Sequence, residues 1–285
     1  MKAAAFDYVK AGSIEQVIDL LSRHGDDARV LAGGQTLMAT LNMRLSEPAL
    51  VIDITGLATL RGIERRGEAL RIGALTTHSQ IEQSPLVARH APLLVEAAPH
   101  IAHRAIRNRG TWGGSIAYAD PAAEWPACLL ALGGTVVAQG PVGERRIAAD
   151  DFFTGLYTTA LRPDEIVVAG EVPVAAPDGW SGMAQLARRH GDYAIVGLAA
   201  SARRSGSGAL SLPRLAFMGV ATTPWRARRT EALLDGKAPD EATLALAVAS
   251  LRAEIDPLPD LTNTPETKRH LAGVLLQRLL AAARA

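Results

Sequence analysis

The sequence predicts an α+β protein built from three units, residues 1–57, 58–176 and 177–285. The first unit alternates helix-like and strand-like segments, the second begins with a hairpin pattern, and the third places its strands before its helices. Such segregation of strands and helices is typical of an α+β domain rather than of a doubly wound sheet. The length of 285 residues also exceeds the roughly 250 residues at which a single hydrophobic core stops growing.

The first unit starts with an amphipathic helix. Ser13 and Gln16 have the spacing of a capping box, and apolar residues then recur at helical spacing. Its segments follow in the order helix, strand, helix, strand, over 14–23, 29–32, 37–44 and 50–54. This alternation indicates a small α/β unit.

The second unit opens with a β-hairpin pattern, in which Arg66, Gly67 and Glu68 separate two short apolar runs. A stretch with three glycines, 110–120, then interrupts all periodicity. The segments beyond it are a helix over 122–132 and strands over 135–139 and 165–172.

The third unit follows a segment, 173–182, that carries two prolines and two glycines and is therefore the expected domain boundary. Strand-like runs come first and helical patterns last. The predicted strands are 195–202 and 212–220, and the predicted helices are 225–234, 241–251 and 265–283.

Composition excludes several classes of protein. Thirty Lys and Arg residues against twenty-nine Asp and Glu give a net charge of +1, which provides no broad footprint for nucleic acid or anionic lipid. Cys128 is the single cysteine, so a disulfide and a cysteine-ligated cluster within this chain are excluded and any redox centre here is organic. The early charges at Asp7 and Lys10 argue against a secretory signal. We therefore expect a cytoplasmic protein without a transmembrane segment.

A first glycine loop, Ala32–Gly33–Gly34–Gln35–Thr36, follows a predicted strand and opens a predicted helix. Backbone N–H groups are free at such a position and favour an anion, and Gln35 and Thr36 add side-chain donors. No Lys follows, so the loop is not of the Walker type. The alternative is a tight turn that needs glycine only for its dihedral angles.

A second glycine loop covers 109–116, and Asp120 and Glu124 follow it four residues apart. Two such loops from adjacent units can hold the two phosphates of a dinucleotide, although no Gly-x-Gly-x-x-Gly fingerprint occurs. Asp120 and Pro121 have the residue types of a helix cap and a first helical position. Glu124, one turn into that helix, is available to accept hydrogen bonds from ribose or adenine groups.

These motifs carry a family resemblance. Residues 32–36 and 111–124 resemble the two FAD-binding loops of the medium subunits of molybdenum hydroxylases, a family that includes the flavoproteins of carbon monoxide, xanthine, nicotine and quinoline dehydrogenases. Matching segments at 6–8, 107–110 and 188–194 extend the resemblance over nearly the whole chain. It implies a two-subdomain FAD-binding fold of the vanillyl-alcohol oxidase and p-cresol methylhydroxylase type, followed by a C-terminal α+β domain with an antiparallel sheet and helices.

The resemblance also assigns residues to a noncovalently bound FAD. In this family the first loop lines the diphosphate, the second loop holds its other side, Ile101 packs near the adenine, and Leu161 and Tyr193 border the isoalloxazine. The complete set is Ala32, Gly33, Gly34, Gln35, Thr36, Leu37, Ile101, Thr111, Gly113, Gly114, Ser115, Asp120, Glu124, Leu161, Gln185 and Tyr193. No catalytic residue and no metal ligand is expected in this chain.

Three positions depart from the usual family pattern. Trp112 stands where an aliphatic residue is common, and Tyr118 stands where His is common. Gln185 stands where some relatives have Lys, which removes a cation that would stabilise an anionic reduced flavin.

The resemblance implies an electron-transfer subunit. A small partner subunit would carry two [2Fe-2S] clusters, a large one would carry the molybdopterin cofactor, and the complex would be a heterotrimer or its dimer. The alternative is a free-standing FAD-dependent oxidoreductase with its own small-molecule substrate, with Tyr193 and His190 over the flavin. The substrate, and an acceptor among NAD, quinone, cytochrome and oxygen, stay open at this point.

Overall fold

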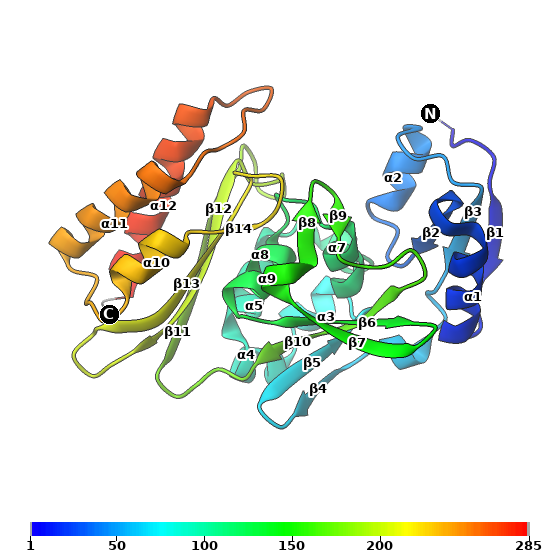
Figure 1. Cartoon of the computed structure of the whole chain (residues 1–285), viewed down its shortest axis with the longest axis horizontal. Helices are drawn as coiled ribbons and strands as arrows, with labels where there is room; N and C mark the ends of the chain where they lie inside the picture. The colour runs from blue at the N-terminus through cyan, green and yellow to red at the C-terminus, as the bar shows by residue number, and fades with distance from the viewer. Residues whose placement is uncertain (1, 284–285) are drawn as a thin grey trace.

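The computed structural model describes residues 2–283, which form four β-sheets along an elongated molecule (Figure 1). The N-terminal three-stranded sheet lies at one end, the five-stranded sheet in the middle, and the four-stranded sheet with three helices at the other end. A two-stranded hairpin stands beside the middle sheet. This mixture of helix and sheet confirms the predicted α+β class.

The N-terminal sheet is parallel, with the strand order β1-β3-β2. Its elements are β1 (Asp7–Lys10), α1 (Ile14–His24), the 3-10 turn η1 (Gly25–Asp27), β2 (Ala28–Leu31), α2 (Leu37–Asn42) and β3 (Leu50–Asp53). Ser13 caps α1 by accepting a hydrogen bond from the Gln16 amide, as the capping pattern predicts. Sequence analysis missed β1, because this edge strand is mostly exposed and has no apolar alternation.

The middle sheet is antiparallel, with the order β4-β5-β10-β6-β7. Its strands are β4 (Ile63–Arg66), β5 (Ala69–Gly73), β6 (Thr135–Gly140), β7 (Gly143–Ala148) and β10 (Ile166–Pro173), and the separate hairpin is β8 (Phe153–Gly155) with β9 (Thr158–Thr159). The helical segments are η2 (Ala58–Leu60), α3 (His78–Glu82), α4 (Pro85–His90), α5 (Pro92–Ala97), η3 (Ala98–His100), α6 (Arg104–Arg107), α7 (Trp112–Tyr118), α8 (Glu124–Ala131) and α9 (Ala149–Phe152). Trp112, Trp125 and Phe152 are fully buried in the core between these helices and the sheet.

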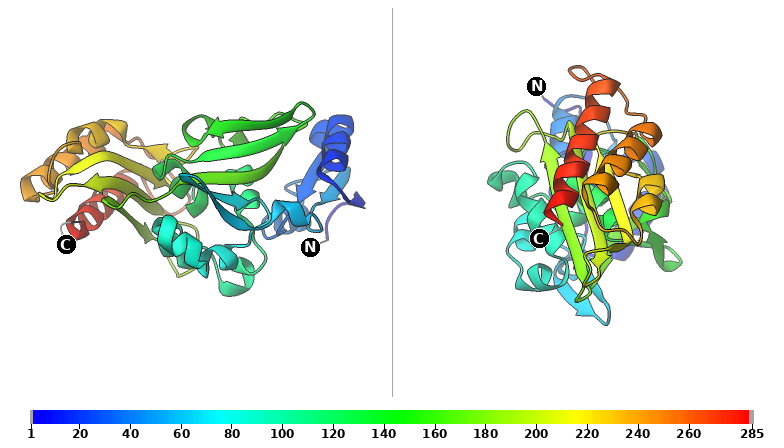
Figure 2. Two further views of the ribbon diagram at one scale, coloured as in Figure 1. Left: turned by 90° about the horizontal axis from the view of Figure 1, so that it is seen from below. Right: turned by 90° about the vertical axis from the view of Figure 1, so that its left-hand side faces the viewer.

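The C-terminal sheet is antiparallel, with the order β11-β12-β13-β14. Its elements are β11 (Gly179–Leu186), β12 (Val196–Arg204), β13 (Leu210–Met218), β14 (Trp225–Arg226), α10 (Arg228–Leu234), α11 (Glu241–Glu254) and α12 (Pro265–Ala282). Figures 1 and 2 show the three helices on one face of this sheet. Alternate residues of β12 serve the two faces: Leu198 packs in the core with the helices, whereas Ala199 packs in the core of the middle unit.

Two C-terminal segments differ from the predicted elements. The expected boundary, 173–182, already contains the start of β11, since Gly179 pairs with Arg203. The expected helix over 225–234 begins only at Arg228, because Trp225 pairs with Phe217 at the sheet edge as strand β14. Strand pairing set the boundaries of both segments. The local periodicity of the sequence contains no information about such pairing.

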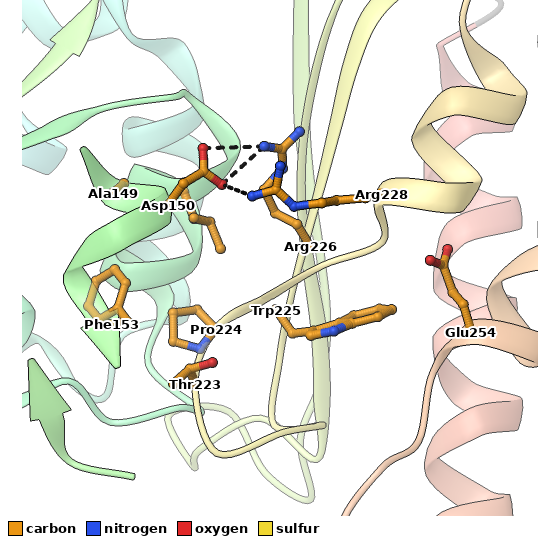
Figure 3. A pocket seen from close by; sticks show the side chains of 10 residues that line it. Ala149, Asp150, Phe153, Thr223, Pro224, Trp225, Arg226, Arg228 and Glu254 are labelled. Carbon is orange, nitrogen blue, oxygen red and sulfur yellow. Dashed lines mark hydrogen bonds and ion pairs between the residues drawn. The ribbon is translucent and has the colours of Figure 1, made fainter. Parts of the chain in front are cut away.

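Ion pairs fix the C-terminal sheet on the middle unit. Asp150 of α9 accepts hydrogen bonds from Arg214 at 2.7 Å, Arg226 at 3.0 Å and Arg228 at 2.8 Å. Asp150, Arg226 and Arg228 border a cavity of about 320 Å³, where Figure 3 shows Asp150 bonded to both arginines above Trp225. These arginines form ion pairs with carboxylates of the same chain, so the cavity lies at a charged contact between the middle unit and the C-terminal sheet. In the part of the chain that the structure describes, no helix is long and apolar enough to cross a membrane.

Candidate functional site

The first glycine loop leaves the carboxyl end of β2 and leads into α2. Gln35 donates a side-chain hydrogen bond to the Gly33 carbonyl at 3.1 Å, and Gly34 adopts a φ of +73°, which favours glycine. Within residues 2–283, the backbone N–H groups of Gly33, Gly34, Gln35 and Thr36 donate to no other group. The loop therefore presents four consecutive free donors at the edge of a parallel sheet, where α/β folds place their ligands.

The two glycine loops touch each other. A Cβ atom added to Gly33 would lie 2.3 Å from the Arg109 carbonyl oxygen and 2.8 Å from the Gly110 Cα atom. A Cβ atom added to Gly114 would lie 3.9 Å from the Ala32 Cβ atom. The structure thus brings together the two loops that sequence analysis singled out, and Gly33 is required for their close approach.

The backbone donors of the second loop, apart from the Thr111 N–H, are already used within the protein. Trp112 N–H donates to the Thr76 carbonyl at 2.9 Å and Gly113 N–H to the Ala74 carbonyl at 2.8 Å. The side chain of Thr111 caps α7 by accepting from the Gly114 N–H at 3.2 Å. Within residues 2–283 the Ser115 hydroxyl makes no hydrogen bond, and the buried Thr111 hydroxyl makes only this cap. The second loop therefore differs from the first, whose backbone donors are free.

The glycines of the second loop serve packing. A Cβ atom at Gly113 would lie 2.5 Å from the Ala74 Cβ atom and 2.7 Å from its Cα atom. At Gly114 the nearest atom would be the Thr111 hydroxyl oxygen, at 2.8 Å. The backbone of Ala74 leaves no room for a side chain at Gly113. At Gly114 a side chain would meet the Thr111 hydroxyl, which can rotate.

The prediction that Asp120 caps the following helix is wrong. Its carboxylate accepts from the Ala122 N–H at 2.8 Å, and the Ala123 N–H donates to the Asp120 carbonyl, so residues 120–123 form a turn. Helix α8 begins only at Glu124, and its N-cap, Ala123, makes no side-chain cap. Asp120 instead supports the loop that joins α7 to α8.

Glu124 is buried at the start of α8. It accepts a hydrogen bond from the Gln185 amide of β11 at 3.2 Å, which links the middle unit to the C-terminal sheet. Burial raises the pKa of Glu124 to about 7. The Gln185 carbonyl oxygen is also buried and has no hydrogen-bond partner within residues 2–283. A buried acceptor without a donor is what a site leaves for a polar group of a ligand.

Three tyrosines surround this acidic region. The rings of Tyr118 and Tyr157 are 5.1 Å apart and tilted by 55°. Desolvation and the nearby Asp120 raise the pKa of Tyr193 to about 12, with smaller effects from Tyr118, Glu124 and Tyr157. Tyr193 is nevertheless 59% exposed, so burial around its hydroxyl leaves much of the residue accessible. Sequence analysis missed Tyr157, because it lies in the β8–β9 turn with a φ of +53° and belongs to no motif.

The remaining predicted residues are Ile101, Leu161 and Leu37, which belong to three separate segments. A Cβ atom at Gly191 would lie 3.0 Å from the Ala102 carbonyl oxygen, so the segment that carries Tyr193 packs on the segment that carries Ile101. Ile101 and Leu161 are half-buried against the core of the middle unit. Leu37 is the first residue of α2, directly after the first glycine loop.

Comparison with known proteins places the chain in a family. Residues 4–175 match the FAD binding domain in molybdopterin dehydrogenase, and residues 182–283 match the CO dehydrogenase flavoprotein C-terminal domain. The chain belongs to the FAD-binding medium subunits of molybdenum hydroxylases. This confirms the family resemblance that was inferred from the sequence motifs.

Individual relatives of this medium subunit cover nearly its whole length. It is 38% identical to the nicotine 6-hydroxylase medium subunit of Paenarthrobacter nicotinovorans, over 99% of each chain. It is 37% identical to the carbon monoxide dehydrogenase medium chain of Hydrogenophaga pseudoflava, over 98% of this chain and 96% of the relative.

Solved structures have the same fold. The carbon monoxide dehydrogenase of Hydrogenophaga pseudoflava matches with a TM-score of 0.96 at 38% identity, over 99% of this chain and 98% of that chain. The quinoline 2-oxidoreductase of Pseudomonas putida 86 matches with a TM-score of 0.93 at 36% identity, over 100% of this chain and 98% of that chain.

The residues of this medium subunit fit FAD. The free amides of 33–36 suit a diphosphate, and neither glycine loop contains a carboxylate that would repel one. The unpaired Gln185 carbonyl oxygen is suited to a donor group of the cofactor.

Proposed function

We propose that this chain is the FAD-binding electron-transfer subunit of a molybdenum-containing hydroxylase complex. Electrons come from [2Fe-2S] clusters on a small partner subunit and leave to an external acceptor, while a large subunit with the molybdopterin cofactor oxidises the substrate. Family membership supports this proposal. The structural observation that carries it is the row of four free backbone donors in the first glycine loop, in contact with the second loop.

Each unit of the chain has its own part in holding FAD. The proposed units are 1–57, 58–176 and 177–285, so the first loop, the second loop and Tyr193 come from three different units. The amides of the first loop bind the diphosphate, and the hydroxyls of Thr111 and Ser115 approach it from the second loop. When bound, FAD supplies the electron-accepting and electron-donating chemistry that side chains lack.

Other side chains position the two ends of the cofactor. Glu124 and Gln185 supply buried polar atoms, and Asp120 holds the loop before α8. Ile101 packs near the adenine. Leu161 and Tyr193 border the isoalloxazine, where the accessible side chain of Tyr193 shields the flavin ring from water.

The cofactor is bound without a covalent link. Neither 32–37 nor 109–116 contains a His or Cys that could attach a flavin. Acid precipitation of the yellow protein should therefore leave all flavin in the supernatant. Flavin that stays with the precipitated chain contradicts noncovalent binding.

The clusters belong to a partner, because a chain with one cysteine cannot ligate an iron–sulfur cluster through cysteine thiolates. We infer a heterotrimer or its dimer, located in the cytoplasm. Purification from the native host tests this inference. The expected result is a complex of three polypeptides with FAD, molybdenum and iron.

The same purification distinguishes the alternative functions. A yellow protein that is active alone on a small molecule would identify a free-standing FAD-dependent oxidoreductase instead. A colourless chain that does not take up added FAD would contradict both flavoprotein functions.

A further inference from the structure

Arg109 lies where the two glycine loops meet. Its carbonyl oxygen is the atom closest to the position of a Cβ atom on Gly33, so its backbone touches the first loop directly. Its side chain is exposed and makes no ion pair or hydrogen bond within residues 2–283. Arg107, two residues earlier, is buried and donates to Glu82 at 2.9 Å. Of these two arginines, Arg109 therefore lies beside the loop contact and has no carboxylate partner.

The electrostatics of the site call for such a cation. A diphosphate brings negative charge, and the first loop, 32–36, contains no Lys or Arg. The side chains that follow the second loop at Asp120 and Glu124 are carboxyls, so they supply no positive charge. Backbone amides supply only partial charges, whereas a guanidinium supplies a full charge and a planar fork that matches phosphate oxygens.

We propose that Arg109 is a phosphate-binding residue whose guanidinium pairs with the diphosphate held by the amides of the first glycine loop. This inference rests on the proposed function as an FAD-binding subunit. The contact between Gly33 and the Arg109 backbone fixes the start of the side chain beside the first loop. No hydrogen bond or ion pair within residues 2–283 holds the guanidinium elsewhere. The alternative is that Arg109 is a surface arginine that contacts only solvent.

Arg104 provides a matched control. It is also exposed, makes no side-chain hydrogen bond or ion pair in the described part of the chain, and lies five residues before Arg109. No atom of Arg104 is among those nearest to a Cβ atom added at Gly33 or Gly34. Arg104→Gln therefore removes one positive charge from the same region of the surface. It leaves Arg109, the cation beside the contact between the two loops, in place.

The test measures affinity of the full chain for FAD and for riboflavin, which lacks phosphates, by flavin fluorescence at low and high salt. Arg109→Gln should weaken FAD binding roughly tenfold, leave riboflavin binding unchanged, and reduce the salt dependence of FAD binding. Arg109→Lys should recover part of the loss, and Arg104→Gln should bind FAD like the wild type. Melting temperatures of all variants should agree, since the side chain makes no contact that folding needs.

Two results overturn the inference. One is an FAD affinity of Arg109→Gln within about twofold of the wild type, and the other is an equal loss for FAD and riboflavin. Failure of the proposed function has a different signature, in which the wild-type chain itself binds no FAD.

Discussion

The first glycine loop keeps its backbone donors free, whereas the second loop uses two of its donors to bind the segment that follows β5. Gly33 and Gly34 belong to a segment whose amides have no acceptor within residues 2–283, while Trp112 and Gly113 donate to carbonyls of 74–76. The first loop is therefore suited to bind charge, and the second is suited to hold the first in place. Similar glycine patterns thus have different physical purposes, and only the hydrogen-bond partners reveal which.

The largest effect should come from Gly33→Val, which acts on the contact between the loops. The new Cβ atom would meet the Arg109 carbonyl oxygen at 2.3 Å, so the loops must separate and the four amides lose their arrangement. Flavin content after purification should fall to nearly zero. Gly206→Val is the control, because a Cβ atom at Gly206 meets nothing within 4 Å. Wild-type flavin content in Gly33→Val would show that the loop contact does not matter.

The two loops also differ in the ionisable groups that accompany them. The first loop contains no carboxyl group, whereas the buried carboxyl of Glu124 follows the second loop. Burial raises the pKa of this carboxyl from its ordinary value of 4.5 to about 7, so the stability that it contributes is complete below pH 4.5 and is lost as the pH rises through 7. The loss amounts to at most about 3 kcal/mol.

Glu124→Gln removes this pH dependence. Denaturant unfolding of the flavin-free protein at pH 5 and pH 8 should show wild-type stability falling relative to the variant as pH rises. A difference between the two proteins that stays constant from pH 5 to pH 8 would contradict a raised pKa at Glu124.

Within the second loop, Gly113→Ala and Gly114→Ala should differ. The methyl group at Gly113 meets the Ala74 backbone and side chain, which cannot rotate away, and the expected loss of unfolding free energy is about 1 to 3 kcal/mol. At Gly114 it meets the Thr111 hydroxyl, which can turn, so the loss should stay near the roughly 1 kcal/mol of an N-cap. Denaturant midpoints measure both. Equal losses would mean that the two glycines have the same role.

The smallest effect on stability is expected at Tyr193. Because 59% of this residue is exposed, Tyr193→Ala creates no core cavity and should change the unfolding free energy by only about 0.5 kcal/mol. FAD should stay bound, while the flavin spectrum and the rate of reoxidation by oxygen should change. An unchanged spectrum and rate would place the ring away from the isoalloxazine.

Local patterns predicted much of this molecule. The capping box at Ser13, the apolar spacing of α1 and the order of strands before helices at the C-terminus all depend on interactions within a few residues, which sequence reports well. Strand β1 was missed, because its conformation depends on pairing with β3 about forty residues away. Tyr157 was missed, because it lies in a short hairpin turn without a motif, and its ring meets Tyr118 only in the folded chain. Asp120 was misjudged as a cap for a related reason: the turn that shifts the start of α8 is not encoded in residue types alone.

The sequence by itself determined the family, the two glycine loops and the absence of a cysteine-ligated cluster, because residue types and their order decide these properties. Tertiary structure decided which loop has free amides, that Gly33 touches the Arg109 backbone, and that Glu124 is buried beside Gln185. Hydrogen-bond partners, close approach and desolvation arise only when segments far apart in the chain are packed together, so no local pattern contains them.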